Sequence, residues 1–571
     1  MLLSRPLLLL VSLSLPLYTL AEVADTILHN AKIYTVDSNM SWAQAVAIKD
    51  GKISYVGSDA GAKAYEGKGT RIVDMKGQFM LPSFQDAHIH PVSSGVAQTA
   101  GCPLFNLDGS EAILNKIAQC VKDDPDAPVI SGFGWSMDDF SKAQPIHRSM
   151  IDTIDNTRPL YFGDSDAHTL WLNSAALAYA GITKETPDPE GGKIGRDKVT
   201  GELTGLLMED SGMNLLMSKL PPPDIEELKK GLEMAQGYLH GLGITAVQDA
   251  IVKVSGYDSY VSLPAYRQLD DAGELKLRVI ASLHWNASKG LAQISALEAA
   301  RKQYSGGRLQ ASTIKFWADG ILESHTAKML KPYTDKPETT GLMMVPREQL
   351  MTAGPALDKL GFQLHIHAIG SATVRYALDT IEASQKTNGK RDARHHIAHV
   401  QMVHPDDIPR FARLDATATI QPMWAYANAY TIDINAPQMG PERMQWMYPT
   451  ASIAKSGGRL AFSSDWSVDT ANPFPGIETA MTRQDPGTST SPVFNVAERI
   501  SLEQAIAAYT TGAAYVNFLD QSTGSIEVGK FADMIVVDRN LFDIPVSEIS
   551  EAKVTVTLLE GEEVYGELLP R

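Results

Sequence analysis

Residues 81–90 read LPSFQDAHIH, a short strand-like run that ends in two histidines one residue apart. Side chains along a β-strand alternate between its two faces, so His88 and His90 point to the same side. At this histidine content roughly 0.3 such pairs arise by chance, so one pair alone is weak evidence of a site. The pair gains weight from its position, because it ends the first of a series of predicted strands.

The middle of the chain, from about residue 80 to residue 519, alternates short apolar segments with helical patterns. This alternation is typical of parallel βα units, and eight strands are the number that a (β/α)8 TIM barrel requires. We therefore predict an α/β fold with eight barrel strands: Phe84–His90, Ile244–Ala250, Leu277–Leu283, Thr313–Asp319, Gln363–Ala368, His395–Val400, Ala416–Gln421 and Leu460–Asp465. About 150 residues separate the first two strands, which predicts a large insertion (about 91–240) of helix-like and loop material at the active-site end.

Both ends of the chain have a different pattern. Residues 25–79 carry short β runs with a hairpin turn signal at Asp50-Gly51-Lys52, and residues 533–558 carry two more runs. We expect the two ends to pair in one small β-sandwich domain. The predicted limits are 22–80 and 521–571 for this domain and 81–520 for the barrel.

The first 21 residues are predicted to be a signal peptide. Arg5 is followed by an apolar stretch, Leu7–Leu17, and by a small-x-small cleavage site, Thr19–Ala21. The run is too short and too interrupted by proline to span a membrane comfortably, although an uncleaved anchor remains an alternative. No other stretch approaches 18 apolar residues. The mature protein is therefore expected to be exported, to the periplasm, without stable membrane insertion.

Composition excludes several classes of protein. The chain has 571 residues, 44% of them hydrophobic, which is enough apolar material for a large core and excludes wholesale disorder. Its 50 basic and 67 acidic residues give a net charge of -17, which argues against a nucleic-acid or anionic-membrane surface. Two cysteines cannot build a zinc ribbon or an iron–sulfur cluster. In an oxidising compartment we expect Cys102 and Cys120 to form a disulfide, with two buried thiols as the alternative.

Ligand-type side chains stand at the carboxyl ends of four predicted strands: His88, His90, His365, His367, His399 and Asp465. TIM barrels place their catalytic residues at these ends. Imidazole and carboxylate groups bind Zn, Mn, Fe or Ni and leave coordination positions open for water. A position behind the ligands or in the core is favoured for His365. Lys315, in the fourth strand, is a ligand only once carboxylated, and on its own it is more often a salt-bridge residue.

Together these motifs resemble the amidohydrolase superfamily, and in particular its amidohydrolase-3 branch, which includes the N-substituted formamide deformylases. The similarity extends from about residue 24 to residue 566. The matching segments are LPSFQDAHIH (81–90), KFWADG (315–320), HAIG (367–370), IAHVQ (397–401), SSDWSVDTANP (463–473) and GKFAD (529–533).

The resemblance implies a metal-dependent barrel hydrolase with a flanking β-sandwich and two divalent ions, zinc first, with Mn, Fe or Ni as alternatives. It implies this ligand set: His88, His90 and Asp465 at one ion, His367 and His399 at the other, and carboxylated Lys315 between them. A metal-activated water would be the nucleophile, and Asp465 would act as general base and then as general acid. The chain departs from the branch pattern at Ser371, Ala398 and His325, where Asp, Glu and Arg are usual, which concerns substrate contacts more than metal binding.

Six side chains are predicted as substrate contacts. His168, Trp171 and Asn173 lie in a segment that resembles a recurrent one of the branch, with a packed insertion helix as an equally good interpretation. The other three predicted contacts are His325, Trp317 and Trp424, which lie at or after the ends of predicted barrel strands. Four tryptophans lie at or just after strand ends (Trp285, Trp317, Trp424 and Trp466), which suggests a pocket wall for an apolar or aromatic acyl or amine group.

The sequence therefore predicts an exported metal-dependent amidohydrolase that cleaves an amide-type C–N bond of a small molecule. Hydrolysis of an ester, lactone or carbamate at the same site is an alternative that sequence cannot separate. A ring deaminase is less favoured, because such sites commonly use one metal ion and do not need the lysine of the fourth strand. A non-catalytic binding protein on a decayed barrel is a further alternative. The sequence does not determine the oligomeric state, and a homo-oligomer is one of the alternatives.

Overall fold

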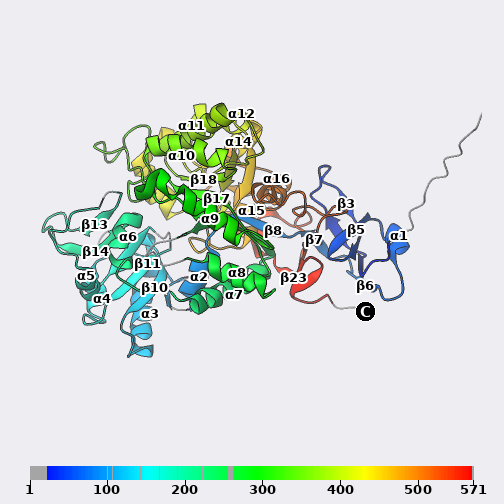
Figure 1. Cartoon of the computed structure of the whole chain (residues 1–571), viewed down its shortest axis with the longest axis horizontal. Coiled ribbons are helices and arrows are strands. Elements are labelled where there is room, and N and C mark those ends of the chain that lie inside the picture. Colours follow the sequence, from blue (N-terminus) through cyan, green and yellow to red (C-terminus); the bar gives the residue numbers. More distant parts are fainter. Residues whose placement is uncertain are drawn as a thin grey trace, which may run out of the picture.

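The computed structural model describes residues 22–99, 101–105, 107–140, 145–165, 168–189, 191–221, 223–254 and 261–568, without the side chain of Asp210. The predicted signal peptide, residues 1–21, lies outside the described residues. A barrel forms the centre of the molecule, with an insertion on its left and a small β domain on its right in Figure 1. Within the described residues, no helix is both long enough and apolar enough to cross a membrane.

Eight parallel strands form the barrel, and each corresponds to a predicted strand. In chain order they are β8 (Phe84–Ile89), β15 (Ile244–Val252), β16 (Arg278–His284), β17 (Leu309–Trp317), β18 (Gln363–Ala368), β19 (His396–His399), β20 (Thr417–Ile420) and β21 (Arg459–Phe462). Each strand pairs with the next one in chain order. Beyond β21, the backbone N of Asp465 donates to His88 O (2.9 Å), which links the last strand to the first. The predicted TIM barrel is confirmed, except that Asp465 follows β21 instead of lying in it.

The barrel strands are buried on both faces. Every residue of β8, β18, β19 and β20 is buried, because side chains fill the inside of the barrel and helices cover the outside. The helices that pack on the strands include α7 (Ile225–Gly241), α8 (Leu263–Asp271), α9 (Ile294–Tyr304), α10 (Arg347–Lys359) and α11 (Ser371–Asn388). This packing leaves the ends of the strands as the place where polar side chains can gather.

The two ends of the chain form two sheets that pack on each other. One sheet has the order β5-β4-β1-β6 and the other β24-β23-β22-β7-β2-β3. The strands are β1 (Thr26–His29), β2 (Lys32–Tyr34), β3 (Trp42–Ala43), β4 (Ala45–Lys49), β5 (Lys52–Gly57), β6 (Arg71–Asp74), β7 (Phe79–Pro82), β22 (Met534–Val537), β23 (Val554–Leu559) and β24 (Glu562–Tyr565). Leu28 and Val46 of the first sheet share a buried core with Ile33, Met534 and Val536 of the second.

β7 pairs with both β2 and β22, so it joins the two ends of the chain in one sheet. The predicted β-sandwich built from both ends is therefore confirmed. Only Ser83 separates β7 from the first barrel strand. The predicted domain limits stay a prediction.

The insertion differs from the expectation of helix-like and loop material. It contains a six-stranded mixed sheet in the order β13-β14-β12-β11-β10-β9. Its elements are α2 (Pro91–Thr99), β9 (Cys102–Pro103), α3 (Gly109–Asp123), β10 (Ile130–Trp135), α4 (Arg148–Asp152), β11 (Leu160–Asp164), β12 (Thr169–Leu172), α5 (Ser174–Ala180), β13 (Lys193–Arg196), β14 (Leu203–Met208) and α6 (Glu209–Met217). The expectation was wrong because these strands are short and glycine-rich, as in ISGFGW of β10, so they lack a clear two-residue period.

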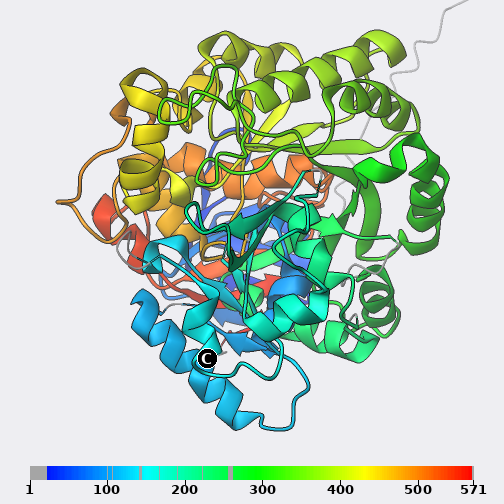
Figure 2. The ribbon, with the colours of Figure 1, turned by 90° about the vertical axis from the view of Figure 1, so that its left-hand side faces the viewer.

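Seen from the left of Figure 1, the insertion stands in front of the barrel (Figure 2). Cys102 of β9 and Cys120 of α3 form a disulfide within it, with an S–S distance of 2.11 Å, so that prediction is confirmed. The bond borders an apolar cluster that includes Ile113, Ile117 and Trp135. The insertion therefore has a core of its own beside the barrel.

Candidate metal centre

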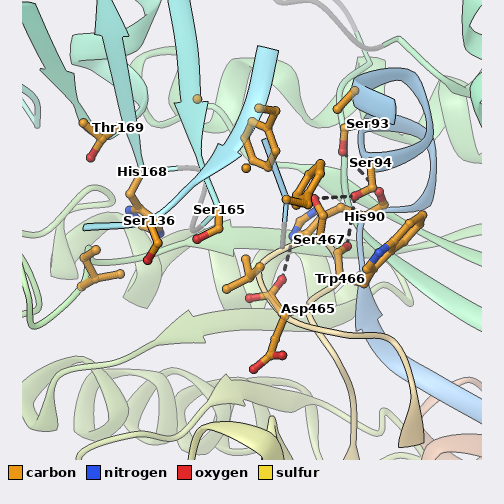
Figure 3. Close-up of a pocket in the computed structure, with 18 of the residues that line it drawn as sticks. His90, Ser93, Ser94, Ser136, Ser165, His168, Thr169, Asp465, Trp466 and Ser467 are labelled. Atoms are coloured by element: carbon orange, nitrogen blue, oxygen red, sulfur yellow. Dashed lines mark hydrogen bonds and ion pairs between the residues drawn. The ribbon is translucent and has the colours of Figure 1, made fainter. Parts of the chain in front are cut away.

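A cavity of about 970 Å³ lies where the carboxyl ends of the barrel strands meet the insertion. All six predicted metal ligands line it: His88, His90, Lys315, His367, His399 and Asp465. Figure 3 shows Asp465 and His90 on the barrel side and His168 near the strands of the insertion. The structure thus brings together residues that lie up to 377 positions apart in the sequence.

Asp465 is the centre of the cluster. Its Oδ1 lies 3.2 Å from His88 Nε2 and 3.0 Å from His90 Nε2, and its Oδ2 lies 3.8 Å from His399 Nδ1. Burial, together with the neighbouring Lys315 charge, lowers the pKa of His88 well below its ordinary value. His88 is therefore a neutral imidazole beside a carboxylate, which is the state that binds a metal ion.

One nitrogen of His88 and one of His399 are already engaged, which fixes the nitrogen that remains on each. His88 Nδ1 is 2.8 Å from His365 Nε2, and His365 Nδ1 is 3.0 Å from Ser282 Oγ. His399 Nδ1 is 2.9 Å from Gln421 Oε1. These contacts leave Nε2 of His88 and Nε2 of His399 for a metal ion, and they place His365 behind His88 as the sequence favoured.

Burial lowers the pKa values of three more side chains at the cavity, Lys315, His399 and His367. The Lys315 ammonium is 2% exposed, its Nζ is 3.3 Å from His88 Nε2, and burial lowers its pKa to about 7. Burial also lowers the pKa of His399 to about 3. His367 Nε2 lies 3.6 Å from Asp319 Oδ1, and burial lowers the pKa of His367 well below its ordinary value. Neutral imidazoles and a partly neutral amine therefore face the cavity at neutral pH.

The predicted ligands fit a metal ion for two reasons: they offer suitable donor atoms, and some of their buried polar atoms lack a hydrogen bond. His88, His399 and Asp465 each offer a ligand atom, and these atoms lie within 4.8 Å of one another. Asp465 Oδ1 and His367 Nε2 are buried, and among the described residues neither makes a hydrogen bond of normal geometry, although two imidazole nitrogens lie within 3.2 Å of Asp465 Oδ1. Buried polar atoms without a partner are costly, and a bound cation would compensate the carboxylate. Nitrogen and oxygen donors of this kind suit zinc, manganese, iron or nickel.

Three of the six predicted substrate contacts line the cavity. His168, Trp317 and Trp424 are on its wall. Trp424 stacks on His399 with an interplanar angle of 6° and centroids 5.5 Å apart, and Trp317 meets His168 edge to face at 4.9 Å. These contacts lock the aromatic rings next to the predicted ligands.

The other three predicted contacts, Trp171, Asn173 and His325, do not line the cavity. Trp171 is fully buried in the apolar cluster of the insertion beside Trp135. Asn173 caps α5, where its side chain accepts from the backbone N of Ala176 (2.7 Å). His325 Nε2 is 3.0 Å from the Asp335 carboxylate. Core packing, helix capping and an ion pair account for these side chains.

Two of the residues that differ from the usual pattern of the branch, Ser371 and Ala398, have structural roles. Ser371 begins α11, and its Oγ accepts from the backbone N of Leu330 (3.2 Å). Ala398 is fully buried in β19, in register with His367 of β18. Both fit their surroundings, and neither reduces the number of ligand-type side chains at the cavity.

Sequence reasoning missed several buried carboxylates near this cavity, among them Asp249 and Glu209. Asp249 of β15 lines it, accepts from Tyr266 Oη (2.8 Å), and has a pKa raised to about 6 by burial. Its position at the end of a predicted strand could have indicated it. Glu209 lies behind His168, with Oε2 2.7 Å from Nδ1. No strand-end rule indicates Glu209, because it belongs to the insertion.

Comparisons with known proteins agree with this geometry. A family model described as "Amidohydrolase family" matches residues 71–565. Over 551 residues the chain is 31% identical to Protein LONG AFTER FAR-RED 3 of Arabidopsis thaliana (95% of this chain, 92% of the relative). It is 24% identical over 551 residues to N-substituted formamide deformylase of Arthrobacter pascens (95% and 98%).

Among solved structures, a metal-dependent hydrolase from Pyrococcus horikoshii OT3 matches with a TM-score of 0.71 at 23% identity. The match covers 91% of this chain and 99% of that one. At this identity the likeness shows the fold alone. The family model, which spans most of the chain, shows more: this protein belongs to the amidohydrolase family.

Proposed function

We propose that the protein hydrolyses an amide-type carbon–nitrogen bond of a small molecule with the help of two divalent metal ions. The observation that carries the proposal is the convergence of six ligand-type side chains on one cavity, around Asp465. Zinc is the first choice of metal, and Mn, Fe or Ni would suit the same donors.

The proposed ligand set divides between the two ions: His88, His90 and Asp465 for one, His367 and His399 for the other, and carboxylated Lys315 between them. When bound, the ions would supply a water of lowered pKa and polarise the scissile carbonyl. His365 would orient His88 through its 2.8 Å contact, and Gln421 would orient His399.

Asp465 is proposed to move the proton. Its carboxylate faces the cavity and lies within 3.8 Å of three imidazoles. In this position it would accept a proton from the attacking water and pass it to the leaving nitrogen, which completes the hydrolysis. Asp465 therefore serves both as a ligand and as the general base.

The wall of the cavity suggests the kind of substrate. Trp317, Trp424 and Trp466 line it with Phe105 and Phe133. Such a wall favours an apolar or aromatic acyl or amine group beside the scissile bond. The relative named N-substituted formamide deformylase makes N-substituted formamides the first class to test.

We also propose export to the periplasm. The pattern of residues 1–21 supports it, and the Cys102–Cys120 disulfide fits an oxidising compartment. Cell fractionation with N-terminal sequencing would test it: a mature chain that begins near Glu22 is expected outside the cytoplasm, and an uncleaved cytoplasmic chain would contradict export.

The experiment that tests the activity is a substrate screen of the metal-loaded protein with formamides, N-acyl amines, N-acyl amino acids and esters. We expect two metal equivalents per chain and amide turnover that a chelator abolishes. Asp465→Asn should lower kcat by about 100-fold or more, whereas Asp406→Asn, at an exposed carboxylate, should not. Full turnover by a metal-loaded Asp465→Asn enzyme would refute the role of Asp465, and turnover of esters alone would favour the alternative.

A further inference from the structure

Glu209 is a buried carboxylate that the proposed ligand set does not use. It begins α6 directly after β14, and its side chain is 1% exposed. Its φ is 61°, a left-handed conformation that is unfavourable for a non-glycine residue. Such outliers cluster at functional sites, which makes the contacts of Glu209 worth following.

Three side chains contact the Glu209 carboxylate. Oε2 lies 2.7 Å from His168 Nδ1, and Oε1 accepts from Thr326 Oγ1 (2.5 Å) and Ser324 Oγ (3.4 Å). His168 and Glu209 belong to the insertion, whereas Thr326 and Ser324 belong to the barrel loop that follows β17. Gly320 provides the space, because a Cβ there would lie 2.6 Å from Glu209 Oε1. The carboxylate therefore ties the insertion to the barrel next to the cavity.

The pKa of Glu209 supports an ionised carboxylate at this point. Burial alone would raise the pKa, but the charge and hydrogen bond of His168 and the hydrogen bond from Thr326 outweigh burial and hold it below its ordinary value. A buried carboxylate that accepts from an imidazole Nδ1 fixes both the orientation of the ring and the nitrogen that carries the proton.

His168 is held against the predicted metal centre. Its ring meets Trp317 edge to face at 4.9 Å, and its centroid is 5.9 Å from that of His367. Its backbone N donates to Asp164 Oδ1 (2.9 Å), and its backbone O accepts from the N of Glu209 (2.7 Å). His168 lines the cavity, and with Nδ1 on Glu209 its Nε2 is the ring nitrogen on the side away from that carboxylate.

We propose that Glu209 is a positioning residue that fixes His168, and that His168 Nε2 forms a hydrogen bond with the substrate at its reacting amide. The inference rests on the proposed function and deepens it, because it adds a contact that the insertion supplies to the barrel site. Residues of both the barrel and the insertion line the cavity, so the amide would be held between the metal side and His168.

The kinetic test is a double-mutant cycle of His168→Ala and Glu209→Gln, with Glu202→Gln as the matched control. Glu202 is an exposed acid of the same segment, seven residues from Glu209. We expect kcat to fall about 100-fold for His168→Ala and about 10-fold for Glu209→Gln at unchanged metal content, with no effect of Glu202→Gln. The double variant should match His168→Ala, because Glu209 acts through His168.

Losses that multiply in the double variant, or a Glu209→Gln enzyme with wild-type kcat, would overturn the inference. If Glu209→Gln does not fold, Thr326→Val removes the donor to Oε1, and its smaller loss of kcat must likewise vanish in the His168→Ala background. A loss that persists there would make Thr326 and Glu209 purely structural.

A second measurement separates this inference from the proposed function. Ring ¹⁵N spectra of the protein labelled at its 14 histidines should show one signal, absent from His168→Ala, with a proton on Nδ1. Glu209→Gln should change this signal and leave the others unchanged. If no amide is turned over but the signal behaves this way, the proposed function fails and the positioning stands. If amides are turned over and the signal ignores Glu209, the positioning fails.

Discussion

The buried position of Lys315 predicts how the proposed carbamate would form. Only the neutral amine reacts with CO₂, and the product is a carbamate with release of a proton. With a pKa of about 7, the neutral fraction of Lys315 rises from about 0.1 at pH 6 to about 0.9 at pH 8 and is nearly constant above that. An ordinary lysine, with a pKa near 10.4, would still gain about tenfold between pH 8 and pH 9.

The assay follows carboxylation in the metal-free protein. The apoprotein is incubated with ¹³C-labelled bicarbonate at pH 6 to 9, metal is added, and the recovered activity and the carbamate ¹³C signal are measured at each pH. The rate of carboxylation at each pH is divided by the concentration of dissolved CO₂ at that pH. We expect a rise of about tenfold from pH 6 to pH 8 and then a plateau, because the amine is then fully neutral.

Two variants control this experiment. Lys315→Met should lose the ¹³C signal and bind fewer metal ions, whereas Lys302→Met, at an exposed lysine of α9, should behave as wild type. A rate that continues to climb tenfold per pH unit above pH 8 would refute the effect of burial on Lys315. A two-metal enzyme of normal activity that lacks the carbamate signal would refute the bridging role.

Three further predictions concern the insertion and the support of the ligands. Replacing both Cys102 and Cys120 by Ser should lower the free energy of unfolding by about 3 kcal/mol, from the 18-residue separation of the two cysteines; an unchanged urea midpoint would contradict this. His365→Phe should weaken metal binding about 10- to 100-fold in a metal titration, since it removes the partner of His88 Nδ1, and wild-type affinity would mean that His365 only fills space. Trp171→Ala should lower the free energy of unfolding by about 3–5 kcal/mol and leave KM unchanged; a higher KM at unchanged stability would restore Trp171 as a substrate contact.

Periodicity predicted the barrel well because its strands are apolar and regularly spaced. Once eight strands were placed, the rule that their carboxyl ends meet brought His88, His367, His399 and Asp465 to one cavity, as the structure shows. Asp465 shows the limit of the method, since it follows β21 in a left-handed conformation with a φ of 59°. A strand pattern predicts where a strand ends, but not the backbone conformation of the loop that follows it.

The insertion could not be predicted in the same way. Its strands are short, so the pattern of Leu170, Trp171 and Leu172 fits a helix as well as a strand. Trp171 and Asn173 were predicted as substrate contacts because their segment resembles a recurrent one of the branch. In the structure Trp171 packs in the apolar core of the insertion, and Asn173 caps α5. Glu209 was missed because its role depends on a contact with His168, 41 residues away, that no local pattern encodes.

The pairing of β7 with β22 has a consequence for synthesis of the chain. The two strands are separated by about 450 residues, and β22 lies close to the carboxyl end. At the rates at which ribosomes work, β7 would wait roughly 20–90 s for its partner. During that interval the edge of β7, next to the first barrel strand, is available to other chains or to chaperones. The nascent protein should therefore be most vulnerable to aggregation and proteolysis until residues 534–537 have left the ribosome, and truncations that remove β22 should be poorly tolerated.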